Sequence, residues 1–233
     1  MKGLRTIKPS TVISLLLILI APAKVCAQEF FINADFVSSS IWRGMKCRDA
    51  SVEPTLGFTV GGFTVYAWGS TEFKSNSNEI DLYLDYEYKG FKVGIGDYFS
   101  QDGEQPGFFN YKSHSTFHTI EFYAGYTFSE KFPLSLTWNT IFAGNDYKEN
   151  GKRAYSTYIE AAYPFTIKGV DLKAEVGFTP WEGDYSDKFN VTNIGLSATK
   201  AVKITDAFSL PISAKLIANP FEDKLYFVFG VSL

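Results

Sequence analysis

The charged residues that could do chemistry recur at every second position of short segments. From Ile80 to Tyr88, Asp81, Asp85 and Glu87 alternate with apolar and aromatic residues. Side chains alternate across a β-strand, so these carboxylates share one face. Carboxylates that ring the inside of a closed barrel favour the passage of cations. The same alternation predicts an inward-facing set: Asp35, Arg43, Asp81, Asp85, Glu121, Glu160, Lys173, Glu175 and Lys215, joined by Glu87, Lys92 and Asp171.

This inward set has two interpretations. The first is a water-filled, cation-preferring pore, because carboxylates outnumber cations in the set. The second is an internal network of ion pairs and hydrogen bonds in a narrow or blocked lumen. A barrel of about twelve strands lies between those filled by side chains and the wide porins. The sequence leaves both interpretations open.

A lipid-modifying enzyme is the second class of function. Its candidate residues are His114, Ser115, His118 and Glu121. A nucleophile, a base and an orienting group must lie within hydrogen-bond reach of one another. His118 has the parity of Ile120 and so should face lipid or the rim, away from Glu121. No G-x-S-x-G elbow occurs in the chain, and we therefore predict that the protein is not an enzyme.

The long connections suggest a third class, a structural or surface-binding barrel. The segment Gln101–Tyr111 mixes acidic and aromatic residues, and it could constrict the lumen or bind an external ligand, although an ordinary solvated loop is the favoured alternative. Asp184 and Asp187 fall short of the ligand run of a calcium loop. Two histidines and the distant Cys47 do not make a zinc site. We predict no metal and no cofactor.

The first residues read as a secretory signal peptide, Met1–Ala27, which would leave a barrel domain at 28–233. A basic start precedes the low-polarity run Val12–Ile20, which is short for a transmembrane helix. Val25-Cys26-Ala27 fits a cleavage site, and a lipidated Cys26 is a less favoured alternative. Cleavage leaves 18 basic against 25 acidic residues, a net charge of about −7, and this disfavours nucleic acid as a partner.

Twelve strands of about ten residues follow, a length that suits a tilted crossing of a bilayer. Short connections such as Lys89-Gly90 alternate with long ones such as 100–116, which is the loop pattern of an outer-membrane barrel. The predicted fold is all-β, a single antiparallel transmembrane β-barrel with short periplasmic turns and longer extracellular loops. The expected strands are Phe30–Arg43, Ser51–Val60, Phe63–Phe73, Ile80–Tyr88, Phe91–Phe99, Phe117–Phe128, Leu134–Phe142, Tyr155–Phe165, Val170–Phe178, Val191–Val202, Phe208–Ala218 and Leu225–Leu233.

The apolar faces agree with a position in the outer membrane. Aromatic residues crowd the short-turn ends, as in the interfacial girdle of such barrels. The last strand ends in an apolar residue, Leu233, and resembles the closing signal read by the outer-membrane assembly machinery. We therefore expect membrane lipid, that machinery and small solutes or cations as partners. The predicted outward residues are Leu56, Phe58, Val60, Ile120, Phe122, Leu136, Trp138, Leu172, Val176, Ile212 and Leu216.

A set of short motifs lies between Ala34 and Tyr98. The motifs are Asp35-Phe36-Val37-Ser38, Ile41-Trp42-Arg43-Gly44, Ser51-Val52-Glu53-Pro54, Gly61-Gly62-Phe63 and Ala67-Trp68-Gly69-Ser70. In these motifs the chain resembles a family of uncharacterised exported bacterial outer-membrane barrels. The resemblance implies location and fold, and it carries no activity or ligand. We also expect Arg43, near the outer rim, to pair with Asp81 and Asp85, since a buried arginine is most stable beside carboxylates.

Overall fold

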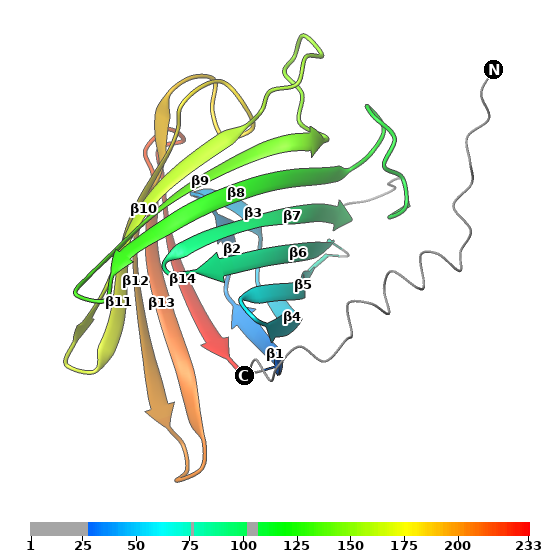
Figure 1. The fold of residues 1–233 in the computed structure, drawn as a ribbon. Helices are drawn as coiled ribbons and strands as arrows, with labels where there is room; N and C mark the ends of the chain where they lie inside the picture. The colour runs from blue at the N-terminus through cyan, green and yellow to red at the C-terminus, as the bar shows by residue number, and fades with distance from the viewer. Residues whose placement is uncertain (1–27, 76, 102–106) are drawn as a thin grey trace, which may run out of the picture.

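The computed structural model describes residues 28–75, 77–101 and 107–233, so the predicted signal peptide Met1–Ala27 lies outside the described residues. Twelve strands form one closed antiparallel barrel, as the sequence predicts (Figure 1). These strands are β1 (Gln28–Val37), β4 (Ser51–Val60), β5 (Phe63–Glu72), β6 (Asn78–Tyr88), β7 (Phe91–Gln101), β8 (His118–Ser129), β9 (Phe132–Gly144), β10 (Thr157–Ile167), β11 (Val170–Thr179), β12 (Asn190–Lys203), β13 (Ser209–Asn219) and β14 (Lys224–Ser232). Within the described residues, no helix is long and apolar enough to cross a membrane.

The barrel closes where the first strand meets the last. β1 pairs with β4 along its whole length and with β14 over the register Asp35–Val37 to Ser232–Gly230. The backbones of Ala34 and Leu233 extend this contact by exchanging two hydrogen bonds of 3.1 and 3.0 Å. Closure matters because an unpaired strand edge is not tolerated in lipid.

Tight turns at one end set the register of the hairpins. Lys89 and Gly90 both have positive φ, 48° and 85°, and Lys168-Gly169 repeats this pattern with 51° and 73°. Two consecutive positive φ angles define the type I′ turn, whose twist matches that of the flanking strands. The predicted turn at Lys89-Gly90 is therefore confirmed, and it fixes which side chains of β6 and β7 face inward.

The connections sort by length much as predicted, with one exception. Residues 61–62, 89–90, 130–131 and 168–169 join strands at the short-turn end, whereas 38–50, 107–117, 145–156 and 180–189 lie at the opposite, long-loop end. The exception is the last pair of connections. The short-turn connection 204–208 is longer than the loop 220–223 that joins β13 to β14.

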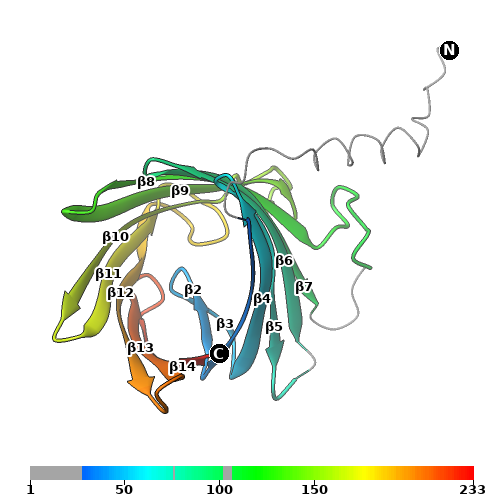
Figure 2. The same ribbon diagram turned by 60° about the horizontal axis from the view of Figure 1, so that its bottom comes forward.

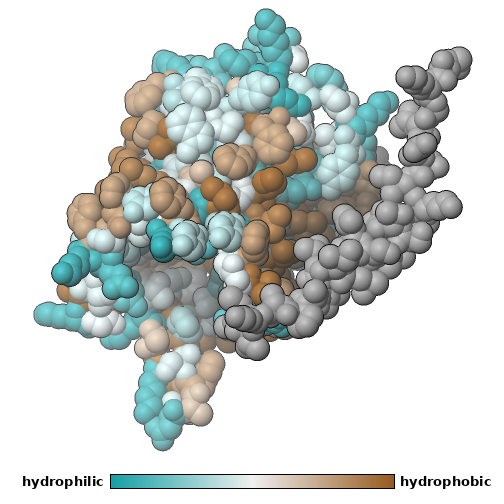
Figure 3. Space-filling view, in the orientation of Figure 1, coloured by the Kyte–Doolittle hydropathy of each residue, from teal (hydrophilic) through white to brown (hydrophobic). Residues whose placement is uncertain are grey.

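The outer surface of the barrel is apolar. Phe30, Ile32 and Phe227 are 80%, 79% and 72% exposed, and each lies on the outward face of its strand. Figure 3 shows brown apolar side chains over the barrel wall and teal hydrophilic ones toward its ends. Strand register places all of the predicted outward residues on this face, including those that are only half-exposed. So large an exposed apolar area needs a partner other than water.

Aromatic rings at the short-turn end contact one another in a continuous row. Phe91 packs on Tyr126 with ring centroids 4.5 Å apart, and the row continues through Phe128 and Phe132 to Tyr163. The predicted crowding of aromatic residues at this end is thus present as a connected band. Such a band is typical of the level of lipid headgroups.

The predicted first strand, Phe30–Arg43, is wrong at its second half. β1 ends at Val37, and the chain then leaves the barrel wall. Residues 40–48, which we call the inner hairpin, comprise β2 (Ser40–Trp42) and β3 (Met45–Arg48). Figure 2 shows this hairpin inside the ring of strands. The reversal arises at Arg43-Gly44, which has φ angles of 53° and 83° and so forms the same kind of turn as Lys89-Gly90.

Candidate functional site: an inner hairpin across the lumen

The tip of the inner hairpin is tied to the opposite wall by an ion pair. The Arg43 guanidinium donates two hydrogen bonds to the Glu121 carboxylate of β8, at 2.6 and 2.8 Å. The Glu121 side chain is fully buried and that of Arg43 is 10% exposed. The predicted pairing of Arg43 with Asp81 and Asp85 is wrong, although its inward position beside a carboxylate is right. Bidentate arginine–carboxylate pairs are among the strongest and most directional hydrogen-bonded contacts.

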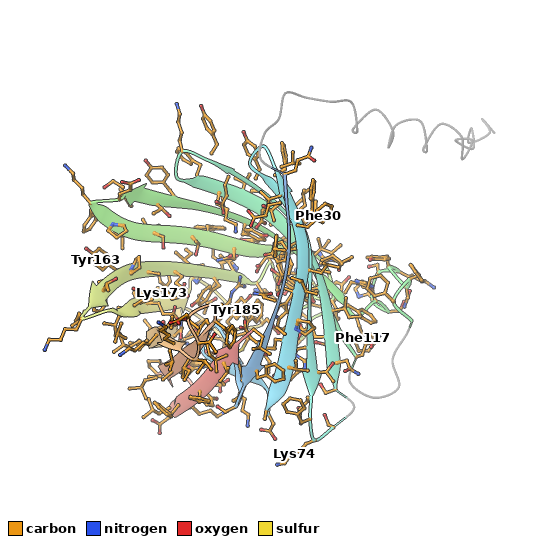
Figure 4. The ribbon with its side chains drawn as sticks, turned by 90° about the horizontal axis from the view of Figure 1, so that it is seen from below. Phe30, Lys74, Phe117, Tyr163, Lys173 and Tyr185 are labelled. Atoms are coloured by element: carbon orange, nitrogen blue, oxygen red, sulfur yellow. The ribbon has the colours of Figure 1, made fainter. Side chains whose placement is uncertain are left out.

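Aromatic side chains enclose this pair. The Arg43 guanidinium carbon lies 4.2 Å from the Trp42 ring centroid and 4.9 Å from that of Tyr158, within range of cation–π attraction. Its Nη1 also donates to the Tyr185 hydroxyl, and the Tyr98 hydroxyl donates to Glu121 Oε2 at 2.8 Å. Figure 4 labels Tyr185 inside the ring of strands. Arg43 Nη1 and Glu121 Oε2 therefore each have two hydrogen-bond partners at the tip.

The rest of the inner hairpin is attached to other parts of the wall. The Arg48 guanidinium pairs with Glu79 of β6 and donates to the Ser100 hydroxyl of β7 at 3.3 Å. On the opposite side, Asn219 Nδ2 donates to the Gly44 carbonyl at 3.2 Å. Contacts thus run from the hairpin to β6, β7, β8 and β13, which hold it across the lumen.

Two cavities lie on either side of the inner hairpin. The larger has a volume of about 760 Å³ and the smaller about 250 Å³. Ile41 and Trp42 line both, so the hairpin is the wall between them. Among the described residues, no group of three or more His, Cys, Asp or Glu side chains is placed to hold a metal ion.

The predicted inward residues on β6 separate into two environments. Asp81 lines the larger cavity, is 4% exposed and accepts a hydrogen bond from the Tyr83 hydroxyl at 3.1 Å. Asp85 lies nearer the short-turn end, pairs with Lys92 of β7 at 2.8 Å and accepts a hydrogen bond from the Tyr123 hydroxyl. Lys92 also reaches Glu87 at 3.4 Å, so this end of the lumen holds a local ion-pair cluster.

A second polar cluster lines the smaller cavity and brings together three predicted residues. Lys173 pairs with Glu175 at 2.7 Å, both on β11. Asn193 Nδ2 of β12 lies 3.1 Å from Glu175 Oε1 and 3.4 Å from Glu160 Oε2, and so links the two carboxylates. Glu160 also accepts a hydrogen bond from the Tyr158 hydroxyl at 2.7 Å.

Three further predicted residues lie on the inner face and line neither cavity. Asp35 stands opposite Glu53 in the β1–β4 register, and Lys215 lies on β13. Neither Asp35 nor Lys215 makes an ion pair with another side chain in the described part of the chain. Asp171, beside the turn at the end of β11, is exposed and accepts a hydrogen bond from Thr166. That these residues line an open pore stays a prediction.

His118 occupies the outward face, as its parity predicts, but it is fully buried there instead of facing lipid. Phe108 and Tyr111 cover it, with the Tyr111 ring stacked 4.0 Å away. Its Nδ1 lies 2.7 Å from Asp97 Oδ1 and its Nε2 lies 2.5 Å from the Phe108 carbonyl oxygen. Because both ring nitrogens face fixed acceptors, neither is free to serve as a base for a nucleophile. This geometry gives the lipid-hydrolase alternative no support.

The described part of Gln101–Tyr111 does not lie in the lumen, so the constriction considered for this loop is not found there. Part of Gln101–Tyr111 lies outside the described residues, and Figures 1 and 2 both draw 107–115 outside the ring of strands. The lumen is instead occupied by the inner hairpin.

Asp184, from the loop 180–189, lines the larger cavity, where burial and the nearby Asp146 raise the pKa of its carboxyl.

Sequence reasoning missed Trp42, Arg48, Glu79, Tyr98 and Tyr185 as partners in the lumen. The first two lie in a segment that reads as a strand and its loop, and Tyr185 lies in a loop without periodicity. One signal was available for the hairpin itself. Arg43-Gly44 has the same basic–glycine pattern as the turns Lys89-Gly90 and Lys168-Gly169, and it could have indicated a tight turn.

The sequence matches no known family profile and no curated protein. Three solved structures are similar in overall shape. An outer membrane channel from Pseudomonas putida is 14% identical with a TM-score of 0.43, covering 91% of this chain and 95% of that one. A porin mutant from Rh. blastica is 10% identical with a TM-score of 0.41, covering 88% and 75%. A chain from a study of in-meso crystallization of membrane proteins is 7% identical with a TM-score of 0.46, covering 88% and 83%. At these identities and scores the likeness carries no weight for ligand or activity.

Proposed function

We propose that this protein is an outer-membrane barrel that acts as a small passive channel with a preference for cations. The inner hairpin is the constriction of this channel, and the two cavities are its vestibules. The observation that carries the proposal is the position of the hairpin between two cavities inside a closed barrel.

Charge supports the choice of cations. The described lumen contains ion pairs at Arg43–Glu121, Arg48–Glu79, Lys92–Asp85 and Lys173–Glu175. Outside these pairs, the inner face also holds the carboxylates of Asp35, Glu53, Asp81 and Glu160 and the ammonium group of Lys215. Acidic side chains left unneutralised in a lumen raise the local concentration of cations.

Location and partners follow from the outer surface. The apolar wall suits the hydrocarbon of a membrane, and the connected aromatic band suits the lipid headgroups at the short-turn end. The closed ring of strands satisfies the backbone without water, as a span of the outer membrane requires. We further propose that the outer-membrane assembly machinery inserts the chain and that residues 1–27 direct its export.

Single-channel recording tests the proposal. Protein extracted from outer membranes in detergent is reconstituted in a planar bilayer under a salt gradient. We expect discrete conductance steps and a reversal potential of the sign that cation selectivity gives. Steps with an anion-selective reversal potential, or silence from protein shown to be folded, would contradict the channel.

A plugged structural or surface-binding barrel is the second candidate. The buried Arg43–Glu121 pair favours it, because the four contacted strands hold the inner hairpin in place. This candidate predicts no conductance from the unmodified protein. It also predicts that conductance appears when the pair is broken.

Cys47 offers a probe of the larger cavity, which its side chain lines. The Cys47 side chain is exposed to the cavity, but the protein around it displaces water, and this desolvation, followed by the charge of Glu79, raises the pKa of the thiol to about 11. The thiolate is the reactive form. At pH values below that pKa, we therefore expect each increase of one pH unit to raise the rate of modification by a cationic methanethiosulfonate about tenfold. If the cavity lies on the conduction path, the attached trimethylammonium group will lower the conductance.

The matched control for this measurement is Cys47→Ser, which removes the thiol and preserves its approximate size. The variant should show the same initial conductance and no response to the reagent. Complete modification of Cys47 without any change in conductance would place the larger cavity off the conduction path.

A further inference from the structure

The larger cavity has a composition that passive conduction does not require. Its volume of about 760 Å³ falls in the range of roughly 300–1,000 Å³ typical of ligand pockets. Its wall combines aromatic rings with carboxylates. A wide aqueous path needs neither the rings nor the enclosure, whereas a ligand with both a positive charge and an apolar surface would use both.

The aromatic part of the wall is ordered by ring contacts. Tyr66 and Tyr83 stack with centroids 4.4 Å apart and planes 8° from parallel. Tyr98 contacts both Tyr83, at 5.7 Å, and Trp42, at 5.8 Å. Trp68 stands directly opposite Asp81 in the β5–β6 register. These five rings line one continuous surface with a carboxylate in its midst.

The charged part of the wall has a deficit of cations. Glu53, Asp81 and Asp184 line the cavity, and none of them forms an ion pair within the described residues. The one lining cation, Arg48, is already paired with Glu79. Asp81 is 4% exposed and has neutral donors only, the Tyr83 hydroxyl and the Phe99 backbone N–H. Burying a carboxylate without a cation is costly, and a bound cation offsets that cost.

We propose that this cavity binds a small organic cation with an ammonium group, which contacts Asp81 and the faces of Trp68 and the neighbouring tyrosines. Aromatic faces attract ammonium groups, and the attraction strengthens when water is excluded. A metal ion fits less well, because no group of three ligating side chains is available in the described part of the chain. The proposal rests on the proposed function and names the class of solute that the channel would select.

Calorimetric titration with choline tests the site. The control ligand is 3,3-dimethylbutan-1-ol, which has the shape of choline without its charge. With detergent-extracted protein, we expect choline to bind at least about tenfold more tightly than the neutral alcohol, the scale of one charge-assisted contact. Equal affinities, or no heat from either ligand, would overturn the proposal.

Two variants assign the binding to this cavity. Asp81→Asn keeps the shape and removes the charge, and we expect it to weaken choline binding about tenfold. Trp68→Leu should weaken it without any change of charge. Asp206→Asn, at a side chain 99% exposed in a short-turn connection, makes the same change in net charge and should leave the affinity unchanged. Choline binding that survives both cavity variants would overturn the assignment.

The outcome of the choline-binding experiment can be distinguished from the outcome of the conductance experiment. Conductance without choline binding would reject this site and leave the proposed function intact. Choline binding without conductance would support the site and reject the passive channel. Far-UV circular dichroism of each variant shows that a lost affinity is not a lost fold.

Discussion

Replacing Arg43 with alanine is expected to release the inner hairpin and to raise the single-channel conductance. The substitution leaves the fully buried Glu121 carboxylate without its cation and removes the guanidinium from between Trp42 and Tyr158. Breaking a buried ion pair by removing one partner costs about 3–5 kcal/mol. Contacts at Arg48 and Gly44 remain, so the hairpin should become mobile without leaving the lumen. The measurement is conductance in a planar bilayer, with hydrogen exchange of residues 40–48 as the structural readout.

The matched control is Arg153→Ala. Arg153 also stacks on an aromatic ring, with its guanidinium carbon 4.8 Å from the Tyr147 centroid, but it belongs to the loop 145–156 at the end of the barrel. We expect its loss to leave the conductance unchanged. The double variant Arg43→Ala/Glu121→Ala should regain part of the lost stability, because it removes the uncompensated charge as well. Unchanged conductance in Arg43→Ala would show that the hairpin does not gate the lumen.

Much of this barrel is predictable from local patterns. The period of two in β6 assigns each side chain to a face, and the turn at Lys89-Gly90 then fixes the register of the next strand. The alternating segments recur along the chain, and their number predicts an even count of strands. The lengths of the segments between them predict short turns at one end of the barrel and longer loops at the other. These properties depend on neighbours in sequence or on the adjacent strand, and for that reason the sequence is enough to predict them.

The contacts inside the lumen depend on how far along the barrel axis each side chain lies and on which strand of the opposite wall it faces. Alternation places both Asp81 and Glu121 inside, but it does not say which of them Arg43 can reach. The Arg43–Glu121 pair spans 78 positions in sequence and joins a hairpin tip to the far wall. Ile41 and Trp42 are truly in a strand, β2, so their pattern looked like a continuation of β1. The change of direction after Val37 has no periodic signal, and the turn at Arg43-Gly44 was its one local sign.

The second large effect is expected for Gly44→Ala. Gly44 has a φ of 83°, and a Cβ added there would lie 1.8 Å from the Thr192 backbone carbonyl oxygen. Backbone atoms cannot move aside as a flexible side chain can, so the turn must withdraw from β12. That movement would also lengthen the hydrogen bond from Asn219 to the Gly44 carbonyl. We expect faster hydrogen exchange over residues 40–48 and a higher conductance, as in Arg43→Ala.

Gly151→Ala separates the close approach from the backbone conformation. Gly151 has a similar φ of 76°, and nothing lies within 4 Å of the position of its Cβ. Both alanines therefore incur the left-handed strain of about 1–2 kcal/mol, and Gly44→Ala alone adds the collision with Thr192. We expect Gly151→Ala to lower the stability slightly and to leave conductance and hairpin exchange unchanged. Equal effects of the two substitutions would mean that the contact with β12 does not hold the hairpin, and its attachment would then depend on the charged pairs at Arg43 and Arg48.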